Sequence, residues 1–514
     1  AGNCGLVGTY TDSLRDVQGF TATEVAGVWG GAEPIPGLGD LALNGVGDTM
    51  VISCSGTGDC SAGGTYIDGS GTSHAFAVNE HAGAWGTAQT LPLGASLPVL
   101  APSTFANLTC TAPGQCVAVG GYATSTAAQS FVATETGGVW AGAIDVPGTQ
   151  ALNAGGESLG TSLACVSASA CTMSGIYTDA SGQLQVYVDN SSGGVWGTAT
   201  AVSGLVGLNS GGAALASDTA CSSLGNCAIG GTYTISGGAL EAFVADEDHG
   251  VWGSAEELPG SGALNVGGAA AVASLACPSD GVCEAVGVYA DSPATAEAFV
   301  AQRTGGQWQS AIQFPGIAEL NAGESAAAQS VSCVAPGDCR AVGGYTDVAK
   351  AGQSFDASEV GGIWQNVEET PGSAALNTEG SSQLEWLSCT PDGGCAAAGV
   401  YKDASGFTQV MTFNTAAMVS APPPTAPGAP KIRAVSRSKG DLTVSVVVKP
   451  TTGGAAVTAY QYSLNGGAWR RASGGATSFT LKHLKSGRRD KVRVRAVDSV
   501  GTGAASAAVS VKVR

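Results

Sequence analysis

The sequence predicts an all-β protein made of a large repeat domain followed by a smaller β-sandwich. Three observations lead to this prediction. Residues 1–415 repeat one pattern at a nearly constant period, and the apolar runs within each repeat are short and separated by turn-forming residues. Beyond residue 430 the composition changes and new strand patterns begin. No apolar run reaches the length of about 10–12 residues that a buried helix needs, so the runs indicate strands.

Each repeat contains the same skeleton. A Cys-x5-Cys pair is followed by a glycine four residues after the second cysteine, a tyrosine two residues further, then an aromatic residue and a tryptophan. The stretch from Cys110 to Trp140 contains Cys116, Gly120 and Tyr122 in this order. The repeat that begins at residue 270 has four strand-like runs, AAVASLAC, CEAVGVYA, EAFVAQ and QWQSAIQF. Four short strands per repeat, in tandem copies, are typical of the blades of a β-propeller.

The number of blades follows from counting strands. Residues 1–415 contain eight copies of the second and third strands of the repeat, but only seven first strands and seven fourth strands. We therefore favour eight blades, of which the first and the last are incomplete. Seven blades remain open as an alternative, in which the strand that ends at Cys389 pairs with the strand that starts at Cys4.

The order Gly120, Gly121, Tyr122, Trp140 and Pro147 resembles the blade of kelch-type propellers. The Cys-x5-Cys element is not part of that family's pattern, and the full repeat is similar to the repeats of secreted bacterial propeller proteins. This resemblance covers roughly four-fifths of the chain and implies an architecture, not an activity.

Fourteen of the fifteen cysteines form seven pairs at identical spacing, with turn-forming residues between the two members. A loop this short between adjacent antiparallel strands suits a disulfide. Zinc sites use closer spacing and gather four ligands, whereas these pairs lie one per blade. Disulfides predict an oxidising compartment, so we expect a secreted or cell-surface protein, and the resemblance to secreted bacterial propeller proteins implies a bacterial one. The predicted disulfides are Cys54–Cys60, Cys110–Cys116, Cys165–Cys171, Cys221–Cys227, Cys277–Cys283, Cys333–Cys339 and Cys389–Cys395.

Cys4 has no partner at this spacing. The residues AGNC at the start of the sequence match the last four positions of the Cys-x5-Cys loops. We therefore expect the partner of Cys4 six residues earlier, upstream of Ala1.

Residues 416–430, AAMVSAPPPTAPGAP, predict an extended Pro/Ala linker. Residues 431–514 contain about the number of strands of a seven-stranded sandwich. The segments PGAPKIRAV, AYQYSLNGGAW and LKSGRRDKVRVRAVDSVGTG resemble a fibronectin type III domain. Asp490 stands where that family has its corner tyrosine, which leaves the tyrosine's hydrogen bond open.

Charge is divided unevenly between the two parts. Residues 1–426 contain five basic and 37 acidic side chains, whereas residues 427–514 contain 16 basic and three acidic ones. The acidic part should repel nucleic acid and anionic surfaces, and the basic part should be attracted to anionic surfaces. The alternative is that the acidic charge serves solubility and attracts the basic part of the same chain.

Two kinds of polar residue recur at the turns of the repeat: an aspartate two residues after the tyrosine, and an asparagine in the connection to the next repeat. We expect both at one face of the propeller, opposite the disulfide loops. Their oxygens suit Ca²⁺ or carbohydrate hydroxyls, but the favoured interpretation is structural, because aspartate and asparagine stabilise turns through their own backbone. These candidate ligand-binding residues are Asp12, Asp68, Asp179, Asp291, Asp347, Asp403, Asn44, Asn153, Asn209, Asn265, Asn321 and Asn377.

The sequence offers little support for catalysis. His74 and His81 are not at metal-ligand spacing, and we expect both at the surface. Adjacent carboxylates such as Glu256 and Glu257 point to opposite faces of a strand and cannot act as a glycosidase pair. We predict no catalytic residue, metal or cofactor. The recurring tyrosines and tryptophans are expected in the core, whereas Trp386 lies outside the skeleton and is a better candidate for a specific role.

The leading hypothesis is an extracellular or cell-surface binding or scaffold protein without catalytic activity. Its partner would be a cell-envelope polysaccharide or another surface protein, with the basic domain as spacer and envelope contact. The alternative is a carbohydrate-active enzyme with an accessory fibronectin type III domain, and a third hypothesis is a purely structural surface repeat. We expect a monomer that binds no nucleic acid. No run of 18 or more apolar residues occurs, so no membrane span is predicted.

Overall fold

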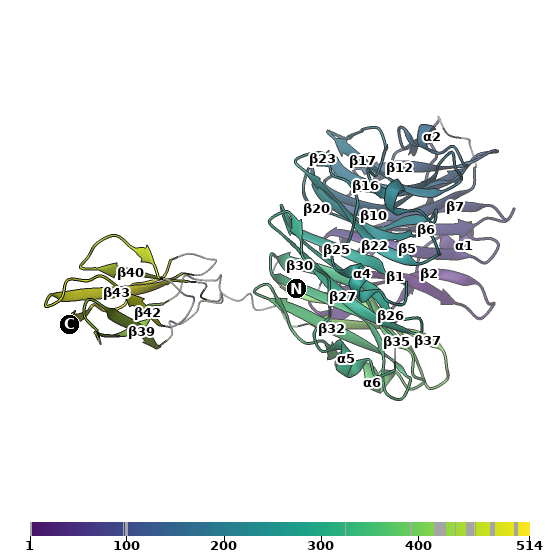
Figure 1. Ribbon diagram of the computed structural model, residues 1–514. Coiled ribbons are helices and arrows are strands. Elements are labelled where there is room, and N and C mark those ends of the chain that lie inside the picture. Colours follow the sequence, from purple (N-terminus) through teal and green to yellow (C-terminus); the bar gives the residue numbers. More distant parts are fainter. Residues whose placement is uncertain are drawn as a thin grey trace. The chain divides into compact units, whose positions relative to one another are not determined.

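The computed structural model describes residues 3–95, 97, 101–323, 325–390, 393–415, 428–436, 438–448, 457, 459–472, 478–497 and 502–514 (Figure 1). The chain divides into two compact units, Ala1–Met418 and Val419–Arg514. Residues 416–427, which form most of the predicted linker, lie outside the described residues. No described helix is long and apolar enough to cross a membrane.

The first unit consists of eight antiparallel sheets, one per repeat, in which consecutive strands of the chain are neighbours. The first strands of the repeat are β5 (Gly47–Gly56), β10 (Ser103–Ala112), β15 (Ser158–Ser167), β20 (Ala214–Ser223), β25 (Ala271–Ser279), β30 (Ala326–Ala335) and β35 (Ser382–Cys389). The second strands are β1 (Gly5–Thr11), β6 (Asp59–Ile67), β11 (Gln115–Ala123), β16 (Ala170–Thr178), β21 (Asn226–Thr234), β26 (Val282–Ser292), β31 (Asp338–Thr346) and β36 (Cys395–Lys402). The third strands are β2 (Val17–Val25), β7 (Ser73–His81), β12 (Ala128–Thr136), β17 (Leu184–Ser192), β22 (Leu240–Asp248), β27 (Thr295–Thr304), β32 (Gly352–Val360) and β37 (Thr408–Thr415).

The fourth strand is split into two short pieces, both paired with the third strand. The pieces are β3 (Val28–Trp29) and β4 (Glu33–Pro34), β8 (Ala84–Trp85) and β9 (Gln89–Thr90), β13 (Val139–Trp140) and β14 (Ile144–Asp145), β18 (Val195–Trp196) and β19 (Thr200–Ala201), β23 (Val251–Trp252) and β24 (Glu256–Glu257), β28 (Gln307–Trp308) and β29 (Ile312–Gln313), and β33 (Ile363–Trp364) and β34 (Glu368–Glu369). The first sheet begins with β1, and the described part of the last sheet ends with β37.

The connection to the next repeat, for which the sequence indicated only turns, contains a helix of one turn in six repeats of the part of the chain that the structure describes. Its start is set by a glycine, which follows a proline in five of the six cases and adopts a left-handed conformation, as at Gly148 with φ 90°. The helices are α1 (Leu38–Leu41), α2 (Thr149–Leu152), α3 (Leu205–Leu208), α4 (Ser261–Leu264), α5 (Ile317–Leu320) and α6 (Ser373–Leu376).

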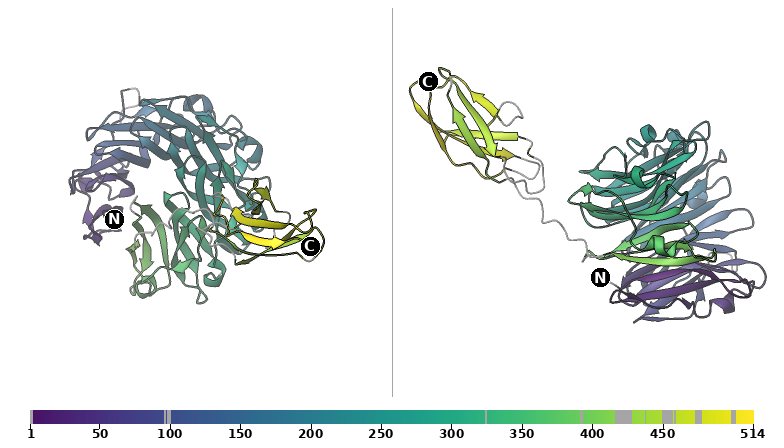
Figure 2. Two further views of the ribbon diagram at one scale, coloured as in Figure 1. Left: turned by 90° about the vertical axis from the view of Figure 1, so that its left-hand side faces the viewer. Right: turned by 90° about the horizontal axis from the view of Figure 1, so that it is seen from below.

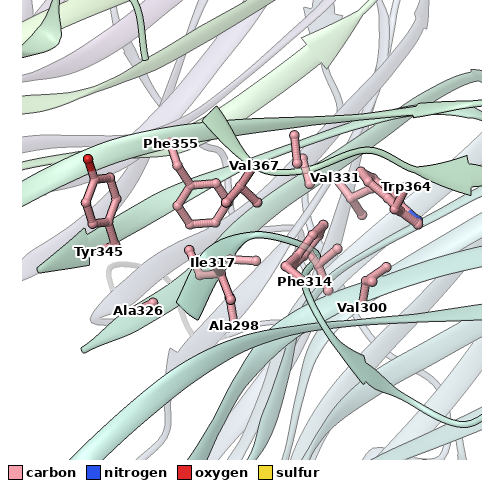
Figure 3. Close-up of a cluster of buried hydrophobic side chains, with 14 of the residues drawn as sticks. Ala298, Val300, Phe314, Ile317, Ala326, Val331, Tyr345, Phe355, Trp364 and Val367 are labelled. Atoms are coloured by element: carbon pink, nitrogen blue, oxygen red, sulfur yellow. The ribbon is translucent and has the colours of Figure 1, made fainter. Parts of the chain in front are cut away.

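The core lies between consecutive sheets. In Figure 3, Ala298 and Val300 of one sheet face Phe355 and Trp364 of the next, with Phe314 between them. The aromatic residue of the third strand covers the glycine of the second strand. At Gly343, a Cβ atom would lie 2.1 Å from the carbonyl oxygen of Ala327 and 2.8 Å from the ring of Phe355, so only glycine fits there. This packing explains the glycine and the aromatic residue of the repeat skeleton.

All seven predicted disulfides are present, each joining the end of a first strand to the start of the second. The sheets follow one another from purple to green in Figure 2 (left), and the last sheet comes back beside the first. There the indole Nε1 of Trp29 donates a hydrogen bond of 3.3 Å to Oδ1 of Asn414 in β37.

The described residues of the second unit form two antiparallel sheets. One has the order β38 (Lys431–Val435), β39 (Leu442–Val448), β42 (Ser478–Leu481), and the other β41 (Arg470–Arg471), β40 (Ala459–Leu464), β43 (Arg489–Val497), β44 (Val509–Lys512). Their inner faces share one core, which includes Leu442, Phe479 and Val494. Asp490 is buried, accepts a hydrogen bond from Asn465 and pairs with Arg488.

Candidate functional site

The predicted aspartates lie in the turns between second and third strands. Oδ1 of Asp347 accepts hydrogen bonds from the backbone N–H groups of Ala349 (2.8 Å) and Ala351 (3.0 Å). Its Oδ2 accepts one from Gln353 (3.1 Å). The hydrogen bond from the Ala351 N–H is the main cause that lowers the pKa of Asp347. The same pair of backbone hydrogen bonds recurs at Asp12, Asp68, Asp179 and Asp403.

Asp291 is different, because β26 extends past it and its carboxylate accepts a hydrogen bond from the hydroxyl of Thr295. The five other aspartates use their oxygens to fix a turn, as the structural interpretation of the sequence requires. Such oxygens are already occupied by hydrogen bonds from the protein.

Five of the six predicted asparagines are buried and hold the connection against the third strand of their own sheet. Asn377 donates hydrogen bonds to the carbonyl oxygen of Gly352 (2.7 Å) and to Gln353 (3.1 Å), and it accepts one from the N–H of Ser381 (2.7 Å). The others of this kind are Asn153, Asn209, Asn265 and Asn321. Asn44 is exposed.

Gln353 links the two predicted kinds of residue, since it bonds both Asp347 and Asn377. Gln185 does the same for Asp179 and Asn209. The structure therefore brings the predicted aspartate and asparagine together within a repeat, through a glutamine that the sequence analysis did not select. The resulting network ties the turn and the connection to each other.

His74 corrects one expectation. Its ring is buried, with Nε2 3.1 Å from Oδ2 of Asp68, and packs against Tyr66, because it takes the position that Gln353 has in its repeat. His81 is exposed, as expected, and lies 2.8 Å from Asp59. The structure thus assigns the buried histidine to turn stabilisation.

A second set of polar residues, absent from the sequence analysis, joins consecutive sheets near the disulfides. A buried glutamate of one third strand accepts a hydrogen bond from a polar side chain of the preceding third strand. Gln302 donates to Glu359 over 2.6 Å, and Thr23 donates to Glu80 over 3.1 Å. The remaining pairs are Asn79 with Glu135, Asn190 with Glu247, and Asn414 with Glu24.

Burial raises the pKa of several of these carboxyl groups. It raises the pKa of Glu359 to about 7, and burial together with the negative charge of Glu359 raises the pKa of Glu284 to about 8. Glu284 also accepts hydrogen bonds from Trp364 and Gln302 (both 3.1 Å). Glu284, Glu359 and the sulfur of Cys339 lie within 4.8 Å of one another, but that sulfur is part of a disulfide and offers no thiolate to a metal. These carboxyl groups bind sheets together.

One repeat replaces the glutamate by a cation. Arg303 is buried at the position of Glu359 and pairs with Asp246 (3.1 Å) and Asp248 (2.8 Å) of the preceding sheet. Here the acidic side chains belong to the preceding sheet and the basic side chain to the following one, and the two sheets are still joined. This arrangement supports a structural role for the position.

The second unit carries a basic face on the outer side of its four-stranded sheet. Arg489, Lys491, Arg493 and Arg495 alternate along β43 with core residues. In the register of the sheet, Lys512 lies beside Arg489, and Arg471 shares the neighbour Gln461 with Arg495. Arg495 also lies over the ring of Trp469 at 4.3 Å. These six cations, Arg471, Arg489, Lys491, Arg493, Arg495 and Lys512, are called the basic face below.

Together these features define an all-β protein of repeated antiparallel sheets with local disulfides, followed by a two-sheet unit with a basic face. No protein-family model matches the chain. No curated protein matches it either.

Among solved structures, the chain is similar to the sixth fibronectin type III domain of human fibronectin type III domain containing protein 3, at 25% identity over 17% of this chain and 87% of that one, with a TM-score of 0.16. It is also similar to the twitchin kinase region of C. elegans, at 20% identity and a TM-score of 0.16, and the match covers 17% of each chain. Likenesses at these TM-scores carry no argument about fold or function.

Proposed function

We propose that the protein is an extracellular or cell-surface binding and scaffold protein without catalytic activity. Its first unit is an eight-bladed, kelch-like propeller that serves as a platform for a partner. Its second unit is a fibronectin type III-like domain whose basic face contacts an anionic cell-envelope polysaccharide.

The contacts between sheets support a closed ring of eight blades. Each hydrogen-bonded residue pair between third strands joins consecutive sheets, as Asn190 and Glu247 do. Asn414 and Glu24 make the same contact between the last and the first sheet. This repetition is expected of a closed ring, in which the last blade contacts the first blade in the same way as any two consecutive blades contact each other.

The seven disulfides support an extracellular location, because such bonds persist in oxidising compartments. One of them closes each turn between a described first strand and the second strand that follows it in the first unit. A cytosolic protein would keep these thiols reduced.

The basic face is the observation that carries the envelope contact. Strand neighbours lie about 5 Å apart and alternate residues of one strand about 7 Å apart, so the six cations form one continuous positive surface. The described acidic side chains of this unit are Asp441, which lies beside the other sheet, and Asp490, which faces the core. A polymer with regularly spaced negative charges would contact several of these cations at once.

The test measures binding of the full chain to immobilised poly(glycerol phosphate), with neutral dextran as the control polymer. The triple variant Lys491→Gln, Arg493→Gln, Arg495→Gln should bind at least about tenfold more weakly and respond less to salt, because charges at the polymer are lost. The matched variant Lys431→Gln, Lys482→Gln, Lys485→Gln removes the same charge from outside the basic face. Equal loss in both variants, or equal binding of the unaltered chain to dextran, would reject the proposed contact.

A further inference from the structure

The edge of β1 distinguishes the first sheet from the other seven. Strands β6, β11, β16, β21, β26, β31 and β36 each pair with a first strand on one side and a third strand on the other. Strand β1 is equivalent to them in the repeat, but it pairs with β2 alone among the described strands. Its second edge therefore presents backbone N–H and C=O groups that can pair with another strand.

A groove of about 690 Å³ runs along this edge. Its lining includes Cys4, the start of β1 (Gly5, Leu6, Val7), Trp29, and residues of β5, β35 and β36. In the third sheet, the corresponding place beside β11 is filled by β10, which packs between β5 and β15. The groove thus has the position of a first strand, between the first strands of the neighbouring sheets.

Cys4 lies at one end of the groove, and it is the free cysteine of the chain. Its seven counterparts, such as Cys60, are bonded to the cysteine that ends the adjacent first strand. The Cys4 thiol is half-buried, and burial with a hydrogen bond to Glu24 raises its pKa to about 11. A thiol of this kind reacts slowly with small reagents, because little of it is thiolate at neutral pH.

The wall of the groove repeats the contacts that hold first strands elsewhere. The hydroxyl of Ser53 accepts a hydrogen bond from the N–H of Cys110 (2.9 Å) in the next sheet, and Ser332 accepts one from Cys389 (3.1 Å). Ser388 is the equivalent serine of the last sheet, and it is exposed on the groove wall. It offers the same acceptor to a strand placed in the groove.

Trp386 gives the groove an apolar wall. Its side chain is 64% exposed in the groove, whereas the equivalent positions of the two preceding repeats hold Ser330 and Ser274. A strand in the groove would cover this indole. The residue that the sequence analysis singled out is therefore a natural reporter for occupancy.

We propose that the free edge of β1 and this groove form an acceptor site for one additional β-strand, supplied from outside residues 1–514, that ends in a cysteine. The strand runs antiparallel to β1, completes the first sheet and forms a disulfide with Cys4. The chain's own first strands define its chemistry, since an apolar residue stands two positions before the cysteine in six of the seven. These residues are Ile52, Leu108, Leu163, Leu275, Val331 and Leu387.

The covalent step is a thiol–disulfide exchange with a disulfide on the incoming cysteine. The Cys4 thiol loses its proton to solvent, and its thiolate attacks the sulfur of the strand. The new bond joins Cys4 to the strand, the old sulfur–sulfur bond breaks, and the second thiolate leaves with the electron pair. The oxidant is the disulfide that the incoming cysteine carries.

The probe is the peptide AAAQSVSC, which copies residues 326–333 of this chain, with its cysteine activated as the mixed disulfide of 2-nitro-5-thiobenzoate. The full chain should release one equivalent of the coloured thiolate and gain the mass of one peptide at Cys4. Docking should make this reaction about tenfold or more faster than with the control peptide AAAQSPSC, whose proline removes a strand hydrogen bond. Hydrogen exchange should then slow in β1.

Two variants separate docking from simple thiol reactivity. Trp386→Ser should reduce the shift of tryptophan emission on peptide binding to the part that Trp29 contributes, but it should retain the disulfide. Cys4→Ser should retain slowed exchange in β1, with weaker binding and no covalent product. Equal reaction rates for the two peptides, or unchanged exchange in β1 after coupling, would overturn the proposal. A chain that already protects β1 in a concentration-dependent dimer would also overturn it, because the occupant would be a second copy.

Discussion

Glu284 and Glu359 form a pair of buried carboxyl groups between two sheets, and at least one of them holds a proton at neutral pH. Glu284 is 2% exposed and its pKa is about 8, against 4.5 for an ordinary glutamate. Between these two values the folded protein binds more protons than the unfolded chain. Stability from this group is therefore present at low pH and is lost as the pH rises through about 8.

The variant Glu284→Gln should make stability less dependent on pH. The unaltered protein should lose free energy of unfolding between about pH 5 and about pH 9, and the variant should lose at least about 1 kcal/mol less, since one pKa unit corresponds to about 1.4 kcal/mol. Denaturant unfolding at both pH values measures the difference. Glu319→Gln, an exposed glutamate of α5, is the control and should leave the pH dependence unchanged. A parallel decline in all three proteins would contradict the assignment.

At the residue scale, sequence reasoning found the turn aspartates and the buried asparagines but missed the glutamates between sheets. A signal was present, because Glu24, Glu80, Glu135, Glu247 and Glu359 each stand five residues before a tryptophan of the skeleton. Their donors lie 56 or 57 residues away in the chain for the four internal pairs, where only the stacking of sheets brings them close. His74 was misplaced because it holds the strand position that Gln353 holds in its own repeat, and this position is buried beside the turn aspartate.

At the scale of single elements, the hairpin between first and second strands owes part of its stability to its disulfide. Replacing Cys221 and Cys227 by alanine should lower the free energy of unfolding by about 2 kcal/mol, because a short loop in the unfolded chain is released. Urea unfolding without reductant measures this loss. The control Cys4→Ala removes an unpaired thiol and should cost clearly less. A cost as large as that of the double variant would contradict a stabilising role of the disulfide.

Most elements follow from local sequence, and the departures have local causes. The strand runs and the Cys-x5-Cys turns were predicted because alternating burial and glycine turns leave a clear pattern. The fourth strand was expected as one run, but it is split into pieces such as β13 and β14. The one-turn helices escaped prediction because four residues are too few for a helical period to be visible.

At the scale of the first unit, a closed ring predicts that the contact between the last and the first sheet stabilises the fold about as much as a contact between two internal sheets. Asn414→Ala and Asn190→Ala each leave a buried glutamate without its amide donor, Glu24 and Glu247 respectively. Each variant should lose about 1–3 kcal/mol, the usual range for a hydrogen bond to a charged or buried group. Thermal and denaturant unfolding of the two variants measure it side by side. Loss in Asn190→Ala with none in Asn414→Ala would argue for an open array.

The repeat period predicted the succession of eight sheets, since each copy carries the same skeleton. The residues through which the last sheet contacts the first could not be read from the sequence, because Trp29 and Asn414 are ordinary members of their repeats. The basic face was visible as composition but not as a surface. It required the register of β40, β43 and β44 to place six cations on one side.

The shortness of the disulfide loops has a consequence for oxidative refolding. Each of the fourteen paired cysteines has its native partner six positions away, whereas the nearest wrong partner, such as Cys110 for Cys60, is at least 49 positions distant. Ring closure over the shorter span is favoured entropically, so correct pairing is reached before any long-range order exists. The fourteen thiols would then form their native disulfides within each hairpin independently. The protein should therefore regain its seven disulfides from a reduced, denatured state without an isomerase.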